Sequence, residues 1–406
     1  MERRMKVFEI GTGYTPIPAT IGAATEIVVE QLANSMLRQG VDITVVDIAA
    51  EERKAHAFPI IEVPIQKFFQ RTDVGLGVMH KMKRVVYSVN LARKLIEILK
   101  ETEEQVVFHF HNQYNAFFFL KLCPLQFRKR CYIAYTNHSY IWFGKWEEIK
   151  RTVSTNYFQE IFSMKHADMN YVLNKKAYHH LTEQLRIPSK RVALIDNGVN
   201  TSAYYPMSEE DKGQTRQRWS AEGKRVFIHI GSVCDRKNQM EAVRLMMPFL
   251  KQFPEYEFWY AGGIIDEAYK EKIDRYVSRH NVSKQVRYLG EVEPGATLNE
   301  IYNIADALVF SSKSEAYGLV ISEALAAGTP VIIKESLEVP MKNLCLTYTD
   351  RREFQNQIKT TIENFNSRKK LSEDGRTAIE AKYSWNKISR RYAEIWESDI
   401  ENRYKE

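Results

Sequence analysis

The amino-acid sequence predicts an α/β protein with two domains, each built around a parallel sheet. Short apolar segments typical of buried strands alternate with longer amphipathic segments typical of helices. This alternation is the pattern of parallel sheets joined by crossover helices. The chain has 406 residues, which is more than a single hydrophobic core usually organises. Its proportions of apolar residues (44%) and charged residues (27%) are ordinary for a globular protein.

The first half of the chain contains six predicted strands and two long predicted helices. The strands are expected at residues 7–10, 43–47, 106–110, 131–135, 171–173 and 192–195. One helix is expected over 25–38, with Gly40 just past its end, and the other over 80–101, where the first turns are basic. A turn at 196–200 closes this half.

The second half repeats the alternation after a polar segment at 208–223. Its strands are expected at 226–230, 257–261, 286–289, 307–310 and from 331 onward. The last helix, at about 385–404, carries apolar residues near helical spacing, namely Ile388, Tyr392, Ile395 and Trp396. We therefore divide the chain into a first domain at 1–204, a second domain at 205–384 and a C-terminal helix at 385–406.

Cysteine usage and hydropathy predict a cytoplasmic protein. The four cysteines are scattered and show no metal-binding or disulfide spacing, which favours a reducing compartment. The N-terminal sequence lacks the pattern of a signal peptide, and no run of about 18 apolar residues is present.

The positive charge is concentrated in the first half of the chain. Residues 1–200 hold 27 Lys and Arg against 20 Asp and Glu, whereas the remaining residues hold 31 of each kind. The excess of +7 favours an anionic acceptor, or peripheral contact with the inner face of a membrane. The alternative is that this charge serves only solubility. No nucleic-acid recognition motif is present, so we expect no nucleic-acid partner.

The most informative segment lies at residues 311–333. A buried strand ends before Ser311, a polar loop carries Glu315, and Gly318 opens a helix that stops at Gly328. Ligands of open α/β sheets bind at the carboxyl ends of strands, where such a loop would lie.

The start of this helix predicts a site for an anion. The free N–H groups of Gly318, Leu319 and Val320 would face the ligand, and Glu323 lies one turn further along the same face. An anion site beside a carboxylate suits a ligand with phosphates and hydroxyls, such as a sugar nucleotide. The alternative is that Glu323 merely complements the helix dipole and Glu315 is a solvated loop residue.

The segment E-A-Y-G-L-V-I-S-E-A-L-A-A-G-T-P-V resembles the signature of retaining glycosyltransferases of the GT-B fold, family GT4. The resemblance implies two Rossmann-like domains that face each other across a cleft, with a last helix that crosses back to the first domain. It also implies that Glu323 holds the donor ribose and Glu315 the sugar hydroxyls. Tyr317 falls within the same donor-binding segment.

Residues 231–238 resemble the family's diphosphate-binding loop. Two adjacent cations, Arg236 and Lys237, follow Gly231 at the end of a strand, where they would stabilise a leaving diphosphate. Lys237 keeps the position of the family lysine. Ser232 replaces the usual arginine, and Arg236 is the candidate to substitute for it. Solvated surface cations are the alternative interpretation of both.

Further positions carry the resemblance more weakly. Gly22 stands where relatives have a glycine loop that approaches the donor, although an ordinary turn is the alternative. His109 and His111 share one face of a strand, and His111 resembles the family histidine that touches the donor sugar. His138 ends the next strand and is a candidate on the acceptor side. Structural histidines are the alternative for both His111 and His138. The remaining donor-binding candidates are Gly262 and Val292.

The sequence as a whole is interpreted as a retaining hexosyltransferase. It would move a hexose from a nucleoside diphosphate sugar, with UDP favoured, to a hydroxyl of a saccharide, a lipid-linked or a small-molecule acceptor. No Asp-x-Asp motif is present, so we expect neither a metal ion nor another cofactor. The alternatives are another GT-B enzyme, such as a phosphorylase or a nucleotide-sugar epimerase, and a non-catalytic module that binds sugar nucleotides.

Overall fold

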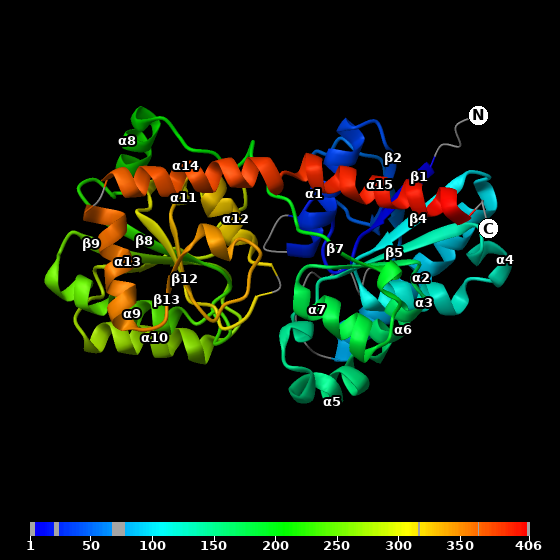
Figure 1. The fold of residues 1–406 in the computed structure, drawn as a ribbon, viewed down its shortest axis with the longest axis horizontal. Coiled ribbons are helices and arrows are strands. Elements are labelled where there is room, and N and C mark those ends of the chain that lie inside the picture. Colours follow the sequence, from blue (N-terminus) through cyan, green and yellow to red (C-terminus); the bar gives the residue numbers. More distant parts are fainter. Residues whose placement is uncertain (1–4, 20–23, 67–77, 316, 364, 404–406) are drawn as a thin grey trace. The chain divides into compact units, whose positions relative to one another are not determined.

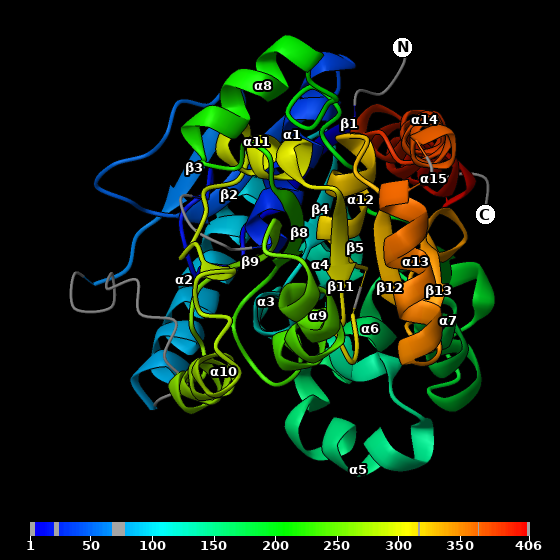
Figure 2. The ribbon, with the colours of Figure 1, turned by 90° about the vertical axis from the view of Figure 1, so that its left-hand side faces the viewer.

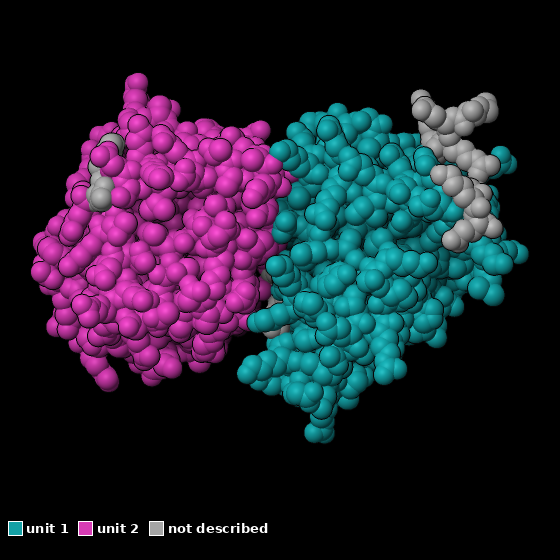
Figure 3. Space-filling model, in the orientation of Figure 1, with its two compact units in different colours: residues 1–198, 385–406 teal, residues 199–384 magenta. Residues whose placement is uncertain are grey.

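The computed structural model describes residues 5–19, 24–66, 78–315, 317–363 and 365–403. It divides into two compact units, which are coloured separately in Figure 3. Unit 1 contains residues 1–198 and 385–406, and unit 2 contains residues 199–384. None of the helices in these described ranges has both the length and the apolar composition that a membrane span requires.

The first boundary between the units lies six residues before the predicted one at 204. Residues 199–204 belong to unit 2 because their backbone is hydrogen-bonded there. The N–H of Val199 donates to the carbonyl of Tyr383 at 2.8 Å, and Arg376 donates to the carbonyl of Tyr204 at 2.7 Å. Both partners come late in the sequence, so local patterns gave no sign of them.

Unit 1 is built on a seven-stranded parallel sheet with the order β3-β2-β1-β4-β5-β6-β7. Its strands are β1 (Met5–Ile10), β2 (Asp42–Ile48), β3 (Ile60–Val63), β4 (Gln105–Phe110), β5 (Cys131–Asn137), β6 (Met169–Val172) and β7 (Val192–Leu194). Six of them overlap the predicted strands, and β3 is an additional strand at the edge of the sheet. The central strands are almost continuously buried, as expected for a parallel sheet covered on both faces.

Helices cover both faces of this sheet (Figure 1). They are α1 (Ala24–Arg38), α2 (Val78–Glu101), α3 (Gln113–Leu122), α4 (Leu125–Arg128), α5 (Trp146–Asn156), α6 (Phe158–His166), α7 (Lys175–His179) and α15 (Trp385–Arg403). On one face, α1 packs against α15, and on the other face α3 packs against both α2 and α6. The predicted helices at 25–38 and 80–101 are confirmed as α1 and α2.

The last helix, α15, returns to unit 1, as the fold prediction required. Ser35 of α1 donates to Asn386 at 2.9 Å and lies 2.8 Å from the Ser389 hydroxyl. Tyr392 and Trp396 are buried on the same helix. These polar and apolar contacts together join the two ends of the chain in one core.

Unit 2 is built on a six-stranded parallel sheet with the order β10-β9-β8-β11-β12-β13. Its strands are β8 (Arg225–Ile230), β9 (Tyr256–Ala261), β10 (Val286–Tyr288), β11 (Ala307–Phe310), β12 (Val331–Lys334) and β13 (Leu346–Tyr348). All five predicted strands are present, and β13 is an additional edge strand. The order reverses between β8 and β11, which is the kind of switch point where ligands of doubly wound sheets bind.

The helices of unit 2 also form a layer on each face of its sheet (Figures 1 and 2). They are α8 (Glu209–Arg218), α9 (Gln239–Gln252), α10 (Glu267–Arg279), α11 (Ala296–Ile304), α12 (Leu319–Ala326), α13 (Arg351–Glu363) and α14 (Phe365–Lys382). One layer contains α9, α10 and α13, and the other contains α8, α11, α12 and α14. The two layers leave the carboxyl ends of β8 and β11 to be covered by loops.

Candidate active site

Two loops of unit 2 bring two cations and a carboxylate together at the switch point of its sheet. One loop follows β8 and carries Arg236 and Lys237, and the other follows β11 and carries Glu315. Lys237 Nζ lies 2.7 Å from Glu315 Oε1, and Arg236 Nη1 lies 3.4 Å from the same oxygen. The Ser312 hydroxyl donates to this oxygen at 2.6 Å. The structure therefore joins three predicted site residues in one charged cluster.

Hydrogen bonds between the two loops hold this cluster in place. The Ser311 hydroxyl donates to the carbonyl of Asn238 at 2.7 Å, and the N–H of Lys313 donates to the carbonyl of Arg236 at 2.9 Å. Arg236 also donates to the carbonyl of Ser314 at 3.0 Å. Because these bonds join neighbouring strand ends, the positions of the charged groups are set before any ligand arrives.

The predicted helix after Glu315 is confirmed as α12. Gly318 is its N-cap, with a left-handed backbone (φ 85°) that favours glycine. The N–H groups of Leu319 and Val320 lie in the first turn, where a helix supplies no acceptor of its own. Gly328 ends the helix with a φ of 75°. The start of α12 therefore has the geometry of an anion-binding helix terminus.

Glu323 lies in the second turn of α12 among tyrosine hydroxyls. Tyr302 donates to its carboxylate at 2.9 Å, and Tyr204 donates to it as well. Burial raises the pKa of Glu323 to about 7, although both tyrosine hydrogen bonds oppose the shift. The carboxyl group of Glu323 therefore holds its proton more readily than an exposed glutamate does. When ionised, it is an acceptor-only group that suits a diol.

Glycines allow the strand ends of unit 2 to approach one another. A Cβ atom at Gly262 would lie 2.2 Å from the carbonyl oxygen of Gly231, so no larger residue fits there. The N–H of Gly262 donates to the carbonyl of Gly290 at 2.8 Å. Val292 is half-buried in the loop that follows. The predicted donor-binding residues Gly231, Gly262 and Val292 thus share the same edge of the sheet.

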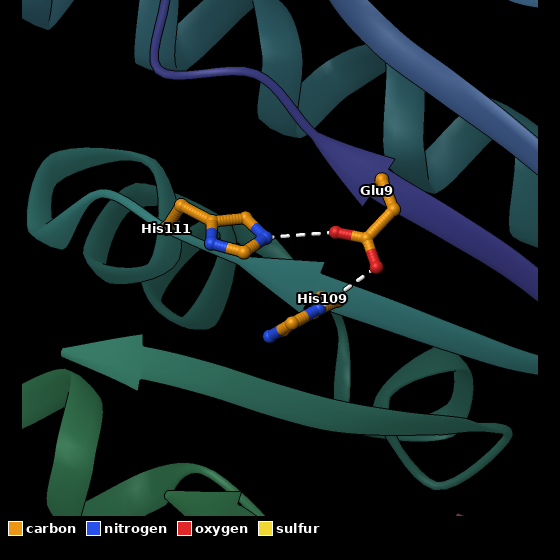
Figure 4. Close-up of side chains that lie close together, drawn as sticks. All are labelled: Glu9, His109 and His111. Carbon is orange, nitrogen blue, oxygen red and sulfur yellow. Dashed lines mark hydrogen bonds and ion pairs between the residues drawn. The ribbon is translucent and has the colours of Figure 1, made fainter. Parts of the chain in front are cut away.

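The histidines of unit 1 meet at the carboxyl ends of β1, β4 and β5. Figure 4 shows Glu9 of β1 between His109 of β4 and His111, which directly follows β4. Glu9 Oε1 lies 2.9 Å from His109 Nδ1, and Glu9 Oε2 lies 2.7 Å from His111 Nε2. His111 Nδ1 lies 2.9 Å from Nε2 of His138, which follows β5. The prediction that His109 and His111 share one face is confirmed.

Burial and mutual contact determine the protonation of this group. Burial raises the pKa of Glu9, but the charge and hydrogen bonds of the two histidines outweigh it and hold the pKa at about 2. Burial and the neighbouring His109 lower the pKa of His111 to about 4. Burial, His111 and His109 lower the pKa of His138 well below its ordinary value. An ionised Glu9 beside neutral His111 and His138 is therefore the stable form near pH 7.

Two family models match consecutive parts of the chain. Residues 25–203 match the model described as Glycosyltransferase Family 4, and residues 211–378 match the model described as Glycosyl transferases group 1. The two matches fall almost entirely within unit 1 and unit 2, respectively. The chain belongs to the GT-B glycosyltransferases of the GT4 family.

Characterised relatives of this GT4 protein share part of its sequence. Mannosylfructose-phosphate synthase of Agrobacterium fabrum is 25% identical over 179 residues, which are 43% of this chain and 39% of that protein. Alpha-monoglucosyldiacylglycerol synthase of Acholeplasma laidlawii is 26% identical over 174 residues, or 42% of each chain. The matches therefore span about two fifths of the length of these relatives.

The GT-B fold also agrees with that of solved structures. HepE of Anabaena, solved in complex with UDP and glucose, superposes on 97% of this chain and 100% of its own with a TM-score of 0.73. Its sequence identity to this chain is 16%, so the comparison concerns the fold. At this coverage it extends over both units.

Other predicted site residues of this GT4 protein fall in different surroundings. Gly22 lies outside the described residues. Tyr317 is buried, with 2% of its surface exposed. His138 is partly exposed, whereas His111 is buried. Of the two histidines, His138 is thus the one with the more accessible side chain.

Two of the predicted residues have partners that were not predicted from the sequence. Glu9 was missed although it is an acid between the apolar residues Phe8 and Ile10 of β1, a pattern that marks a paired buried carboxylate. Tyr204 and Tyr302, the partners of Glu323, carried no local signal. They come from a segment before α8 and from α11, and only the tertiary fold brings them to α12.

Glu9, His109 and His111 are also the kind of residues that hold a metal ion. Their ligand atoms all lie within 4.8 Å of one another. In this structure, however, each histidine nitrogen lies at hydrogen-bonding distance from a different oxygen of Glu9. These contacts give each of the three side chains a hydrogen-bonding partner within the group.

Proposed function

We propose that this protein transfers a hexose from a UDP-sugar to an acceptor hydroxyl with retention of the anomeric configuration. One observation carries the proposal. Glu315, which forms an ion pair with Lys237, lies four residues before the start of α12, and Glu323 lies in the second turn of that helix. This segment offers cations and N–H groups to phosphates, and carboxylates to hydroxyls. A sugar nucleotide needs both kinds of group.

Unit 2 would bind the donor through complementary groups. The first turn of α12, Lys237 and Arg236 would hold the diphosphate. Glu323, fixed by Tyr204 and Tyr302, would accept hydrogen bonds from the two ribose hydroxyls. Glu315 would exchange its contact with Lys237 for sugar hydroxyls. The choice of UDP draws support from HepE, which has the same fold and was solved with UDP.

The chemistry proposed is displacement on one face of the sugar. The bond between the anomeric carbon and the diphosphate oxygen breaks, and a bond to the acceptor oxygen forms on the same face. The acceptor proton passes to the leaving phosphate oxygen. The negative charge on that phosphate grows in the transition state, where the fixed cation of Lys237 stabilises it. No metal ion takes part in this mechanism.

Unit 1 would carry the acceptor and contact the inner face of a membrane. It holds 32 Lys and Arg against 25 Asp and Glu. Leu122, Leu125 and Phe158 are exposed by 45%, 77% and 50% of their surface, and the exposed cations Lys121 and Lys129 lie beside them in the sequence. Exposed apolar side chains with neighbouring cations suit an anionic lipid surface. The relative named for a glucosyldiacylglycerol product supports a lipid acceptor.

A donor screen tests the proposed activity. We expect UDP and one UDP-hexose to raise the melting temperature most among nucleotide sugars, because a ligand at 100 times its Kd stabilises a protein by about 2.7 kcal/mol. Product analysis should then find UDP released in proportion to the glycosylated acceptor. Binding without release of UDP would indicate a non-catalytic module. Release of a sugar phosphate or of an epimerised donor would indicate another GT-B enzyme.

Vesicle sedimentation tests the proposed membrane contact. The protein should sediment with vesicles that contain phosphatidylglycerol, and less with neutral ones. The double variant Leu125→Ser, Phe158→Ser should bind them several-fold more weakly, whereas Leu346→Ser, a half-buried change in unit 2, serves as the control. Equal sedimentation of the double variant and the unaltered protein would exclude this surface.

A further inference from the structure

The carboxylate of Glu9 connects three histidines at the carboxyl edge of the unit 1 sheet. Glu9 and His109 are directly opposite each other in the pairing of β1 with β4. Both are fully buried, so neither can contact a substrate directly. His138, at the other end of the network, is partly exposed. The network therefore runs from a buried charge to an accessible imidazole.

The direction of each hydrogen bond follows from the chemistry of its partners. An ionised carboxylate only accepts hydrogen bonds, so His109 Nδ1 and His111 Nε2 must both carry protons toward Glu9. Neutral His111 then has a lone pair on Nδ1, which faces His138 Nε2 at 2.9 Å. His138 must donate from Nε2, so its Nδ1 carries the lone pair. One carboxylate thus fixes the tautomers of both His111 and His138.

The other end of the network is anchored by the core. His109 Nε2 lies 2.7 Å from the Thr136 hydroxyl, which lies 3.3 Å from the hydroxyl of Tyr392 on α15. The rings of Tyr392 and Trp396 pack at 5.1 Å and 5.4 Å from that of His109. These contacts prevent rotation of His109, and His109 in turn prevents rotation of the Glu9 carboxylate. The orientation of the accessible imidazole is therefore set by residues that lie outside the site.

We propose that Glu9 is a positioning residue that holds His138 in the tautomer with a free Nδ1, so that this nitrogen accepts a hydrogen bond from a substrate hydroxyl. This role rests on the proposed function, because a transferase must orient a hydroxyl-bearing substrate in unit 1. A neutral imidazole lone pair selects the hydroxyl as a donor and rejects an acceptor such as a phosphate oxygen. The substrate group recognised here is thus an uncharged alcohol.

Glu9→Gln tests this role, because its amide places an N–H₂ group against one of the two histidines. Nitrogen-15 NMR of histidine-labelled protein reports each tautomer directly. We expect both His111 and His138 to carry their protons on Nε2 in the unaltered protein, and at least one of His109, His111 and His138 to change tautomer in Glu9→Gln. We also expect kcat to fall about 10- to 100-fold, as for the loss of comparable supporting residues, with little change in the Kd for UDP.

Glu257→Gln is the matched control, because Glu257 is a buried carboxylate on a strand of unit 2. It should leave the histidine spectrum unchanged. The His138→Ala variant serves if Glu9→Gln does not fold, and in it His111 should keep its Nε2 proton. Three results would overturn the proposal: a proton on His138 Nδ1 in the unaltered protein, identical tautomers in Glu9→Gln, or a stoichiometric metal ion bound to Glu9. The NMR readout decides the tautomers even if the protein proves not to be a transferase.

Discussion

The two units share one architecture but carry different chemistry at their strand ends. Each has a parallel sheet between two helical layers, with polar residues in the loops at the carboxyl edge. Unit 1 has a charge excess of +7, and its strand ends carry three histidines that are connected to Glu9. Unit 2 has 26 cations and 26 acids, and it places an ion pair beside a helix start. The shared fold places the site residues at the same edge of each sheet, and the side chains at that edge determine which ligand can bind there.

This difference separates the kinds of group that each unit can recognise. The fixed cations and N–H groups of unit 2 suit a diphosphate, and its carboxylates suit a ribose and a hexose. In unit 1, a lowered pKa favours the neutral form of His111 and His138, and neutral imidazoles suit alcohols. Changes in unit 2 should therefore affect donor binding and departure of the leaving group.

The largest effect is expected for Lys237→Ala. Loss of a fixed group that stabilises developing charge typically lowers kcat by about 10²- to 10³-fold. The Kd of the intact donor should change much less, because its diphosphate carries less charge before the bond breaks. Steady-state kinetics and calorimetry measure the two quantities. Lys313→Ala, which removes an exposed cation of the neighbouring loop, is the control. A raised KM with an unchanged kcat would make Lys237 only a ground-state anchor.

Glu323→Ala should weaken the binding of UDP. Removal of one buried partner of a hydrogen-bonded pair costs about 1.5–3 kcal/mol, and the ribose hydroxyls would lose their acceptor. Calorimetry measures the Kd, and circular dichroism checks that α12 is intact. Glu338→Ala, an exposed change in the same unit, should have no effect on the Kd. A variant of Glu323 that binds UDP as tightly as the unaltered protein would exclude the ribose contact.

The pH dependence of donor binding should reveal Glu323 as well. Burial raises the pKa of Glu323 to about 7, and binding of the ribose requires the ionised form. The affinity for UDP-glucose should therefore rise, by up to about tenfold, between pH 6 and pH 8, because only about a tenth of the carboxylate is ionised one unit below its pKa. UDP-glucose is preferred to UDP because its diphosphate does not titrate in this range. The same rise in Glu323→Gln would assign the effect to another group.

The sequence predicted the central strands better than the edges of the sheets. β1, β4, β8 and β11 are buried between two neighbours and have near-continuous apolar sequences. The missed strands β3 and β13 are short edge strands with a single neighbour each, so neither needs such a pattern. The other two edge strands, β7 and β10, were predicted, so a single neighbour makes a strand harder to recognise in the sequence but does not hide it.

The candidate site was predicted where its residues lie close together in the sequence. Glu315, Gly318 and Glu323 form one continuous motif, and their arrangement on a loop and a helix followed from it. The pairing of Lys237 with Glu315 spans 78 residues, and that of Glu9 with His109 spans 100. Such contacts depend on the order of strands in the sheet, which local patterns do not determine.

The smallest effect is expected for metal removal. The proposed diphosphate site relies on a helix start and two cations for charge stabilisation, so an added ion has little left to neutralise. Transfer should continue in excess EDTA, with the rate reduced by no more than a few-fold. Activity lost to EDTA and restored by one divalent metal would contradict this account of how the charge is stabilised.

The anomeric configuration of the product tests the central claim most directly. In the absence of an acceptor, slow hydrolysis of UDP-α-glucose releases glucose whose first-formed anomer is visible by proton NMR before mutarotation. If Lys237, Glu315 and the start of α12 support displacement on one face of the sugar, α-glucose should form first. Initial release of β-glucose would show inversion and contradict the proposed mechanism.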